Sequence, residues 1–296
     1  TAFEPILQKR RPDWVFVVGD VNSTLACALV SSKMGIPVAH VEAGLRSRDM
    51  TMPEEINRLL TDQIATLLFT PSRDADDNLR REGVAPEKIH FVGNIMIDSL
   101  TKMLPVARRL PVLREFDLQP RRYALATFHR PSNVDDAATL SELLSALAVI
   151  AREFPLIFPV HPRTRQRIAA LNGQYSNHGV RLLEPLGYLE FLALMDSAAM
   201  VLTDSGGVQE ETTFLGVPCL TVRSTTERPI TVSHGTNRLV ASNRDAILSA
   251  FTEVFCLQAT NGKCPELWDG RAAERIVNVM VEMQSLGART ASGGQA

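Results

Sequence analysis

Short apolar runs rich in β-branched residues alternate along the chain with longer segments of helical periodicity. These runs lack a regular polar–apolar alternation, which is typical of strands buried on both faces of a parallel sheet. Helices between such strands then cover the sheet. In the first half the predicted strands are Val15–Val18, Val38–Val41, Leu67–Thr70 and Ile89–Val92, and the predicted helices are Ser23–Met34, Glu54–Ala65 and Asp74–Glu82.

The pattern lapses at Leu104–Pro120, a segment rich in proline and charge that we interpret as a domain linker, and then resumes. The fold class predicted from the two series is α/β, with two doubly wound, Rossmann-like domains that face each other across a cleft and bind ligands at the carboxyl ends of their strands. In the second half the predicted strands are Tyr123–Thr127, Leu156–Val160, Val180–Leu183, Met200–Thr203 and Cys219–Val222, and the predicted helices are Ala137–Glu153, Leu189–Asp196, Val208–Leu215 and Arg244–Phe255.

The predicted domains are residues 1–107 and residues 108–270, followed by a closing helix at 271–286 and a disordered tail at 287–296. The chain opens at Thr1, and Phe3 to Lys9 has the pattern of the end of a helix that leads into the first strand. We therefore expect the first domain to lack its first βα units.

Composition narrows the classes of function. The 296 residues carry a formal net charge of −2 without a basic face, which argues against a nucleic-acid partner. No apolar run reaches membrane-spanning length, no signal peptide opens the chain, and four cysteines without C-x-x-C spacing predict reduced thiols in a cytoplasmic protein. Six histidines without an H-x-x-x-H pair argue against a metal. Walker A and G-x-G-x-x-G patterns are absent, so no ATP or nicotinamide cofactor is predicted.

The most informative stretch runs from Thr203 to Glu211, directly after an apolar run of strand length. Ser205, Gly206 and Gly207 form a turn at a helix start, where backbone N–H groups and the helix dipole favour an anion such as a diphosphate. Glu211 lies one helical turn after Gly207, where its carboxylate can accept hydrogen bonds from ribose hydroxyls. The alternative is a glycine-rich connection with a capping serine.

Acidic residues recur where the strands of the first half end. Asp20 follows the first strand, Glu42 follows the second, and Glu54 with Glu55 begins the next helix after a proline. Each has a structural alternative as a helix cap or an acidic first turn. Neighbouring carboxylates also tend to keep one of their number protonated, which supplies both an acid and a base.

Basic residues follow strands of the second half in the same way. His129 and Arg130 end one strand, and His161 ends the next, where a satisfied packing histidine is an equal alternative. Arg228 lies in a loop after the strand Cys219–Val222, from which it can reach a phosphate.

With these residues assembled, the chain resembles the UDP-N-acetylglucosamine 2-epimerases of the non-hydrolysing bacterial type, which have a two-domain, glycosyltransferase-B-like fold. By this resemblance Asp20, Glu42, Glu54 and His129 match catalytic positions. The resemblance also implies a homodimer and a closing helix at 271–286 that crosses back onto the first domain. It assigns UDP binding to Ser205, Gly206, Gly207, Glu211 and Arg228, beside the candidates Arg130 and His161. The matching stretches are Gly19–Thr24, His40–Arg46, Pro53–Arg58, Val92–Asn94, His129-Arg130, Asp204–Glu211, Thr225–Pro229 and Gly235–Arg238.

The chain departs from this family pattern at two points. Nothing here corresponds to the family's opening strand and its Gly-Thr-Arg-Pro-Glu turn, and Ser132 stands where the family usually has a glutamate.

The resemblance implies interconversion of UDP-GlcNAc and UDP-ManNAc for surface polysaccharide synthesis. The expected route is elimination of UDP to a 2-acetamidoglucal and its re-addition, with UDP and both sugar nucleotides as ligands. Alternatives are a 2-epimerase of a UDP-diacetamido-uronic acid, a hydrolysing epimerase, a glycosyltransferase and an inactive UDP-sugar-binding remnant.

Overall fold

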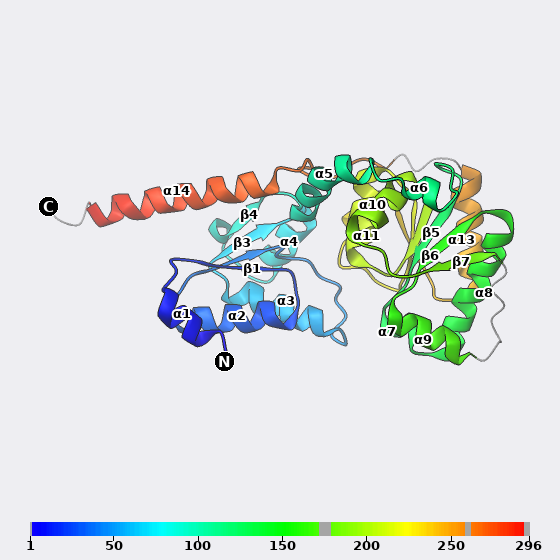
Figure 1. The fold of residues 1–296 in the computed structure, drawn as a ribbon. Coiled ribbons are helices and arrows are strands. Elements are labelled where there is room, and N and C mark those ends of the chain that lie inside the picture. Colours follow the sequence, from blue (N-terminus) through cyan, green and yellow to red (C-terminus); the bar gives the residue numbers. More distant parts are fainter. Residues whose placement is uncertain (1, 172–178, 258–261, 293–296) are drawn as a thin grey trace. The chain divides into compact units, whose positions relative to one another are not determined.

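The computed structural model describes residues 2–171, 179–257 and 262–292, and the chain forms two compact units (Figure 1). Unit 1 comprises residues 1–99 and 266–296, and unit 2 comprises residues 100–265. The predicted boundaries are at 107 and 270, whereas these divisions fall after residues 99 and 265. Both units are α/β with parallel sheets, which is the predicted fold class.

Unit 1 contains a four-stranded parallel sheet of order β1-β2-β3-β4. One face of the sheet packs on helices through Leu7, Ala28 and Leu79, because the strands direct alternate apolar side chains to each face. The elements on this side and in the sheet are α1 (Glu4–Arg10), β1 (Val15–Val18), α2 (Asn22–Lys33), β2 (Val38–Val41), α3 (Pro53–Ile64), β3 (Leu67–Thr70), α4 (Arg73–Arg81), the 3-10 turn η1 (Pro86–Lys88) and β4 (Ile89–Phe91).

The other face of this sheet packs against α14 (Ala272–Ser292), which returns to unit 1 from the far end of the sequence. Ile276 of α14 joins the buried cluster around Phe69 and Val92. The helix continues to Ser292, so the prediction of a disordered tail from 287 is wrong for residues 287–292. Residues 293–296 of that predicted tail lie outside the described residues.

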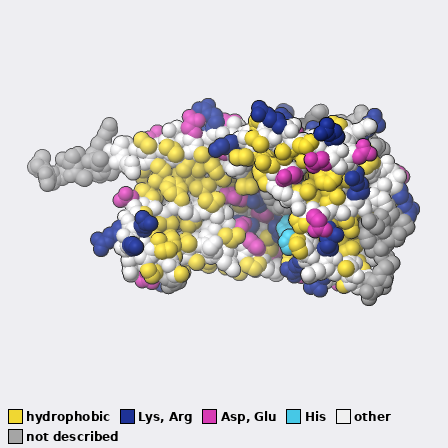
Figure 2. Space-filling view, viewed as in Figure 1, with side chains coloured by type: hydrophobic (Ala, Val, Ile, Leu, Met, Phe, Trp, Pro, Cys, Tyr) yellow, Lys and Arg dark blue, Asp and Glu magenta, His cyan; other side chains and the backbone are white. Residues whose placement is uncertain are grey.

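Strand β1 lies at the edge of the unit 1 sheet, and Phe16 and Val18 on it are 47% and 54% exposed. Figure 2 shows hydrophobic side chains gathered on the face of unit 1 where this strand lies.

Unit 2 contains a six-stranded parallel sheet of order β10-β9-β8-β5-β6-β7. Helices cover both faces of this sheet, since two separate buried clusters share its strands. The elements are α5 (Ile95–Ala107), which begins in unit 1, α6 (Val112–Glu115), β5 (Ala124–Thr127), α7 (Pro131–Val134), α8 (Ala137–Glu153), β6 (Leu156–Pro159), α9 (Pro162–Ala170), β7 (Val180–Leu183), α10 (Tyr188–Ser197), β8 (Met200–Thr203), α11 (Gly206–Leu215), β9 (Cys219–Val222), α12 (Ile230–Ser233), β10 (Asn237–Val240) and α13 (Arg244–Leu257).

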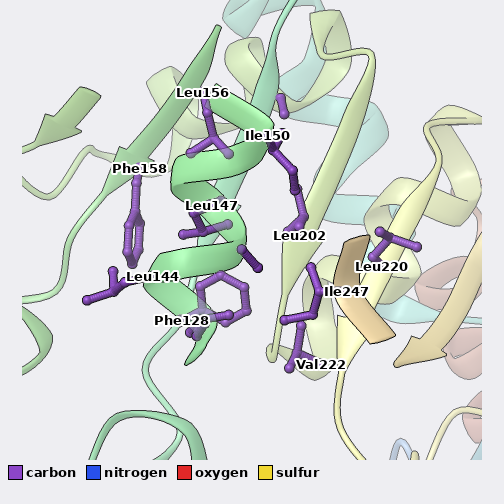
Figure 3. Close-up of a cluster of buried hydrophobic side chains, with 14 of the residues drawn as sticks. Phe128, Leu144, Leu147, Ile150, Leu156, Phe158, Leu202, Leu220, Val222 and Ile247 are labelled. Atoms are coloured by element: carbon purple, nitrogen blue, oxygen red, sulfur yellow. The ribbon is translucent and has the colours of Figure 1, made fainter. Parts of the chain in front are cut away.

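Strand periodicity explains the two clusters. Ala124 and Ala126 of β5 point to one face, while Leu125 between them points to the other. Figure 3 shows the first cluster, in which Leu144 and Leu147 of α8 pack over strand side chains such as Phe158. The sheet is therefore buried on both faces, as the apolar runs predict.

Several segments of unit 2 differ from the prediction, including helix α9 and the short helices α7 and α12, which were not predicted. The expected linker Leu104–Pro120 contains the end of α5 and the whole of α6, because Leu104 and Val112 are buried against the sheet. Strand β10 was not predicted, since Asn237 and Arg238 make its first half polar.

No helix in the described part of the chain is long and apolar enough to cross a membrane. Cys27, Cys219 and Cys264 are free thiols. The side chain of Cys256 lies outside the described residues.

Candidate active site

The predicted site residues of unit 2 gather where the strand order of its sheet reverses. Strand β5 lies between β6 and β8, so the loops that follow β5 and β8 leave the same edge of the sheet in diverging directions. Thr127 and Thr203 are paired in register at the ends of these two strands. His129 and Ser205 therefore both lie two residues beyond a paired position, at the topological switch point where such sheets bind ligands.

Asp204 holds the two loops together. Its buried carboxylate accepts hydrogen bonds from the backbone N–H of Arg130 at 2.9 Å, from the backbone N–H of His129 at 3.1 Å and from the Asn133 amide at 3.1 Å. The Arg130 side chain also donates to the Asp204 carbonyl at 3.0 Å. Asp204 has no assigned role in the sequence-based prediction, although it follows a buried strand directly, which is the local signal for a residue of this kind.

The His129 ring also contacts this carboxylate, with Nδ1 at 3.1 Å from Asp204 Oδ1. Burial acts to raise the pKa of Asp204, but hydrogen bonds and attraction to His129, with donors from Arg130 and Asn133, hold it below the ordinary value. Asp204 is therefore an anion that orients the ring through one nitrogen. The His129 side chain is 50% exposed, which leaves the ring accessible to a ligand.

Helix α11 begins at Gly206, directly after Ser205 at the N-cap. The Ser205 side chain makes no capping hydrogen bond, in contrast to the alternative in which it is only a cap. A Cβ on Gly206 would lie 2.5 Å from Arg228 Nη1 and 2.8 Å from Glu227 Oε1. The Arg228 guanidinium occupies this space, so a side chain at position 206 would have to displace it. Gly207 follows in the same first turn.

Arg228 lies between two buried carboxylates. It pairs with Glu227, and its Nε lies 3.0 Å from Glu210 Oε2. Glu227 also pairs with Arg223 at 2.8 Å and lies 3.9 Å from Arg130. Glu227 thus contacts three guanidinium groups, those of Arg130, Arg223 and Arg228, beside the start of α11. Glu227 and Glu210 were missed as site residues, although both stand in quoted motifs.

Glu211 is buried on α11 and accepts a hydrogen bond from the Tyr188 hydroxyl at 2.8 Å. Burial raises the pKa of Glu211, and the Tyr188 bond offsets only part of that effect. Tyr188, on the neighbouring helix α10, was not predicted as a site residue.

His161 occupies the N-cap of α9, where its Nδ1 accepts the backbone N–H of Arg163 at 3.3 Å. His161 is exposed, so it caps the helix and is not the packing histidine of the alternative, and its assignment to substrate binding stays a prediction.

In unit 1, Asp20 follows β1 and is held by two residues of α3. Its Oδ2 accepts hydrogen bonds from Arg58 Nε at 3.0 Å and Nη2 at 2.7 Å. Asn57 donates to the Asp20 carbonyl at 2.8 Å. Asp20 keeps 24% of its side chain exposed, whereas Arg58 is buried. Arg58 was quoted in a motif but given no role.

Glu54 and Glu55 begin α3 together but have different surroundings. Glu55 is buried and accepts hydrogen bonds from the backbone N–H groups of Ser47 and Arg48, and from Arg58 Nη1 at 2.6 Å. Burial acts to raise the pKa of Glu55, but these donors lower it overall. Glu54 is half-buried, and its carboxylate makes no hydrogen bond or ion pair with the described residues. Glu55 therefore has the structural role, and Glu54 stays open to a ligand.

Glu42 follows β2 directly and lies in the left-handed region, with φ at 72°, which is uncommon for a residue with a side chain and costs about 1 kcal/mol. Its backbone N–H donates to the Phe69 carbonyl at 3.1 Å. Glu42 Oε2 lies 3.9 Å from the position that a Cβ on Gly19 would take, so the ends of β1 and β2 adjoin.

A hollow of about 1030 Å³ opens elsewhere in unit 2, beside Arg121, Arg122 and Glu153. It lies at the edge where β5 and β8 begin, at the opposite end of these strands from Asp204. It contains none of the predicted site residues. In the described part of the chain, no group of three or more His, Cys, Asp or Glu is arranged to hold a metal ion.

Comparison with known proteins gives one family. A sequence profile described as UDP-N-acetylglucosamine 2-epimerase matches residues 1–281. A Methanocaldococcus jannaschii protein named UDP-N-acetylglucosamine 2-epimerase is 44% identical over 285 residues, which are 94% of this chain and 77% of the relative. A Pseudomonas aeruginosa protein named UDP-2,3-diacetamido-2,3-dideoxy-D-glucuronate 2-epimerase is 42% identical over 284 residues, or 95% of this chain and 78% of that relative.

Solved structures give the same result. The M. jannaschii UDP-GlcNAc 2-epimerase in complex with UDP-GlcNAc and UDP superimposes with a TM-score of 0.86, covering 95% of this chain and 79% of that one. The Neisseria meningitidis UDP-GlcNAc 2-epimerase bound to UDP-GlcNAc is 32% identical, also with a TM-score of 0.86, covering 95% and 79%.

Proposed function

Because this chain belongs to the UDP-N-acetylglucosamine 2-epimerase family, and is thus a sugar-nucleotide epimerase, we propose that it interconverts UDP-GlcNAc and UDP-ManNAc. The observation that carries the proposal is the start of α11, where Arg228 fills the space beside Gly206. A helix start with an adjacent guanidinium is an anion site of the kind that a diphosphate requires.

We assign binding of the UDP part of the substrate to unit 2. Ser205, Gly206 and Gly207 offer backbone N–H groups to the diphosphate, and Arg228 adds charge. The three guanidinium groups of Arg130, Arg223 and Arg228, which gather around Glu227, support this assignment. The Glu211 carboxylate accepts hydrogen bonds from the ribose hydroxyls. These hydroxyls replace the Tyr188 hydroxyl on the carboxylate or bind beside it.

We assign removal and return of the C2 proton of the sugar to unit 1. The C2 hydrogen of the sugar becomes acidic only when the bond from C1 to the diphosphate oxygen breaks and UDP departs with the electron pair. A carboxylate then removes the C2 proton, and a C1–C2 double bond forms in a 2-acetamidoglucal. Return of a proton to the opposite face of C2, with re-addition of UDP at C1, yields the C2 epimer.

Asp20, Glu42 and Glu54 are the proposed acid and base, without an order among them. The two hydrogen bonds from Arg58, which fix the Asp20 carboxylate, support a role for Asp20 at the reacting carbon. For Glu54, the support is a carboxylate that has no hydrogen bond or ion pair with the described residues. For His129, proton transfer and contact with the diphosphate are equal alternatives, and the Asp204 contact at Nδ1 supports either role.

A second substrate has support from one comparison. The relative named as a 2-epimerase of a diacetamido-glucuronate nucleotide is 42% identical, nearly the same as the M. jannaschii relative at 44%. The second candidate substrate is therefore a UDP-diacetamido-uronic acid, which carries one more carboxylate than UDP-GlcNAc.

The deciding experiment is proton NMR of each sugar nucleotide incubated with the protein in D₂O. For UDP-GlcNAc we expect deuterium at C2 and a new anomeric signal of UDP-ManNAc, because elimination exchanges the C2 hydrogen with solvent. Free ManNAc in the same spectrum indicates a hydrolysing epimerase, and transfer to an added acceptor sugar indicates a glycosyltransferase. Measurable UDP binding without exchange on either substrate contradicts the proposal.

A further inference from the structure

His40, the third residue of β2, is fully buried and makes a hydrogen bond through each ring nitrogen. Nδ1 lies 2.6 Å from Asp62 Oδ1, and Nε2 lies 2.9 Å from the Gly19 carbonyl oxygen. An ionised carboxylate and a carbonyl are acceptors only. With Asp62 ionised, only a ring that carries a proton on both nitrogens satisfies both contacts, which is the imidazolium form.

The groups behind the ring hold Asp62 as an anion. Arg46 Nη2 lies 2.7 Å from Asp62 Oδ2, and the Gly44 N–H donates to the same oxygen at 3.1 Å. Arg46 in turn pairs with Glu82 at 2.6 Å. Burial acts to raise the pKa of Asp62, but His40 and Arg46 lower it overall. Asp62 therefore provides a fixed negative charge to the histidine at neutral pH.

On the Nε2 side, the ring contacts the turn that carries the proposed catalytic residue Asp20. Gly19, whose carbonyl accepts the hydrogen bond from His40 Nε2, has φ at 69° and immediately precedes Asp20. Burial acts to lower the pKa of His40, but the Asp62 bond and charge, the Gly19 carbonyl and the charge of Glu42 raise it overall. His40 thus joins Asp62 on α3 to the turn that carries Asp20.

We propose that His40, kept doubly protonated by Asp62, is a positioning residue that fixes the Gly19–Asp20 turn and the end of β2 for proton transfer at the substrate. The inference rests on the proposed function, since it concerns the same carboxylates. His40 is buried and takes no part in bond making itself.

A pH dependence follows from this arrangement. The charged groups that face the ring are Asp62 from α3 and Glu42 from the end of β2, while Arg46 and Glu82 act through Asp62. As the pH rises through the pKa of His40, one ring N–H is lost, and either Gly19 or Asp62 loses its donor. Turnover then falls on the alkaline side, while UDP binding in unit 2 is unaffected.

The test compares His40→Gln with the wild-type protein in steady-state kinetics across pH. We expect kcat to fall about 10- to 100-fold, since small displacements of catalytic groups cost rates of this order. We expect KM to change less than about twofold and the alkaline fall of kcat to disappear. His90→Gln, at a half-buried histidine on β4 of the same unit, is the matched control and keeps both kcat and the pH profile.

Two further measurements keep the inference testable if His40→Gln does not fold. Nitrogen-15 NMR of the wild-type ring should show both nitrogens of His40 protonated at pH 7. Asp62→Asn, which keeps the shape but removes the charge, should move the alkaline fall of kcat to lower pH. A neutral His40 ring at pH 7, or unchanged kinetics in both variants, overturns the inference. Absence of C2 exchange in the wild type is instead a failure of the proposed function, and the NMR result on His40 is independent of it.

Discussion

Asp204 holds His129 twice, because its carboxylate accepts the His129 backbone N–H at 3.1 Å and lies 3.1 Å from the ring Nδ1. One buried anion therefore fixes both the path of the loop after β5 and the orientation of the exposed ring. Since Asp204 also begins the turn into α11, the histidine and the predicted diphosphate site are mechanically linked within unit 2.

Asp204→Asn tests this link. The asparagine retains one acceptor oxygen, but its NH₂ group then faces N–H donors of Arg130, His129 or Asn133. We expect the free energy of unfolding to fall by about 1–3 kcal/mol, the usual cost of unsatisfied buried groups. We also expect kcat/KM for C2 exchange to fall at least tenfold. The control is Asp135→Asn, at a partly exposed ion pair with Arg163, for which we expect a loss of at most about 1 kcal/mol and no loss of exchange.

Asp20→Asn separates chemistry from nucleotide binding. A positioned acid or base contributes about 10²- to 10⁴-fold, so we expect kcat to fall within that range. Affinity for UDP, measured by calorimetry, should remain unchanged because its assigned residues lie in unit 2. Asp13→Asn, at an exposed residue of the same unit, is the control. Normal turnover in Asp20→Asn removes Asp20 from the catalytic residues.

Gly206→Ala tests the space beside Arg228. The new Cβ meets Arg228 Nη1 at 2.5 Å and displaces the guanidinium from the start of α11. We expect UDP affinity to fall about tenfold or more. Gly216→Ala, at the C-cap of the same helix with φ at 67° and open space around it, should lower the melting temperature but leave UDP affinity unchanged. Equal UDP affinity in both variants contradicts the role assigned to position 206.

Glu211→Gln should stabilise the protein and weaken UDP binding together. Burial raises the pKa of Glu211, so the folded state binds its proton more readily than the unfolded state, and the ionised form costs stability at neutral pH. That cost applies above the folded pKa and disappears below the unfolded pKa. We therefore expect the melting temperature of Glu211→Gln to exceed the wild-type value at pH 8, with the difference shrinking as the pH falls.

The same variant should bind UDP about tenfold more weakly, because glutamine offers one acceptor oxygen where the carboxylate offers two. Glu184→Gln, with a side chain that is 81% exposed, is the control for both measurements. A less stable Glu211→Gln at pH 8 contradicts the electrostatic argument.

Much of the fold could be predicted because its strands are buried on both faces. A run such as Met200–Thr203 is apolar up to its last residue, so its limits are visible in the sequence, and the structure confirms them. Strand β10 could not be found this way, because Asn237 becomes buried only by bonding to Gln209 and Thr221 of neighbouring elements. In α5, Pro105 indicated a linker, but the helix tolerates it in its last turn while Leu104 packs against the sheet.

The site residues divide in the same way, into those that local sequence patterns reveal and those that depend on partners far away in the sequence. The turn at Ser205 to Gly207 and the acidic strand ends are local patterns, and the structure has them at strand ends as expected. The residues that brace them depend on distant partners: Arg58 reaches Asp20 across 38 residues, and Asp204 reaches His129 across 75. No spacing in the sequence predicts such pairs without the strand order.

Glu54 and Glu55 are adjacent, but Glu55 is assigned a structural role and Glu54 a catalytic one, so variants of the two can be compared directly. Glu55→Gln loses the ion pair with Arg58 and presents an NH₂ group to the backbone N–H of Ser47 or Arg48. We expect the free energy of unfolding at pH 7 to fall by about 1–3 kcal/mol. Glu54→Gln should leave the melting temperature unchanged and lower kcat about 10²- to 10⁴-fold.

The pH dependence of these variants has a definite sign. The donors to Glu55 hold its folded pKa below the ordinary value, so its contribution to stability is present above the unfolded pKa of about 4.3 and is lost as the pH falls through the folded pKa. The stability difference between wild type and Glu55→Gln should therefore be constant from pH 6 to 8 and should shrink below about pH 4.3. Thermal melts of both variants from pH 3 to 8 measure this. A constant difference down to pH 3, or an unstable Glu54→Gln, contradicts the division of roles between the two residues.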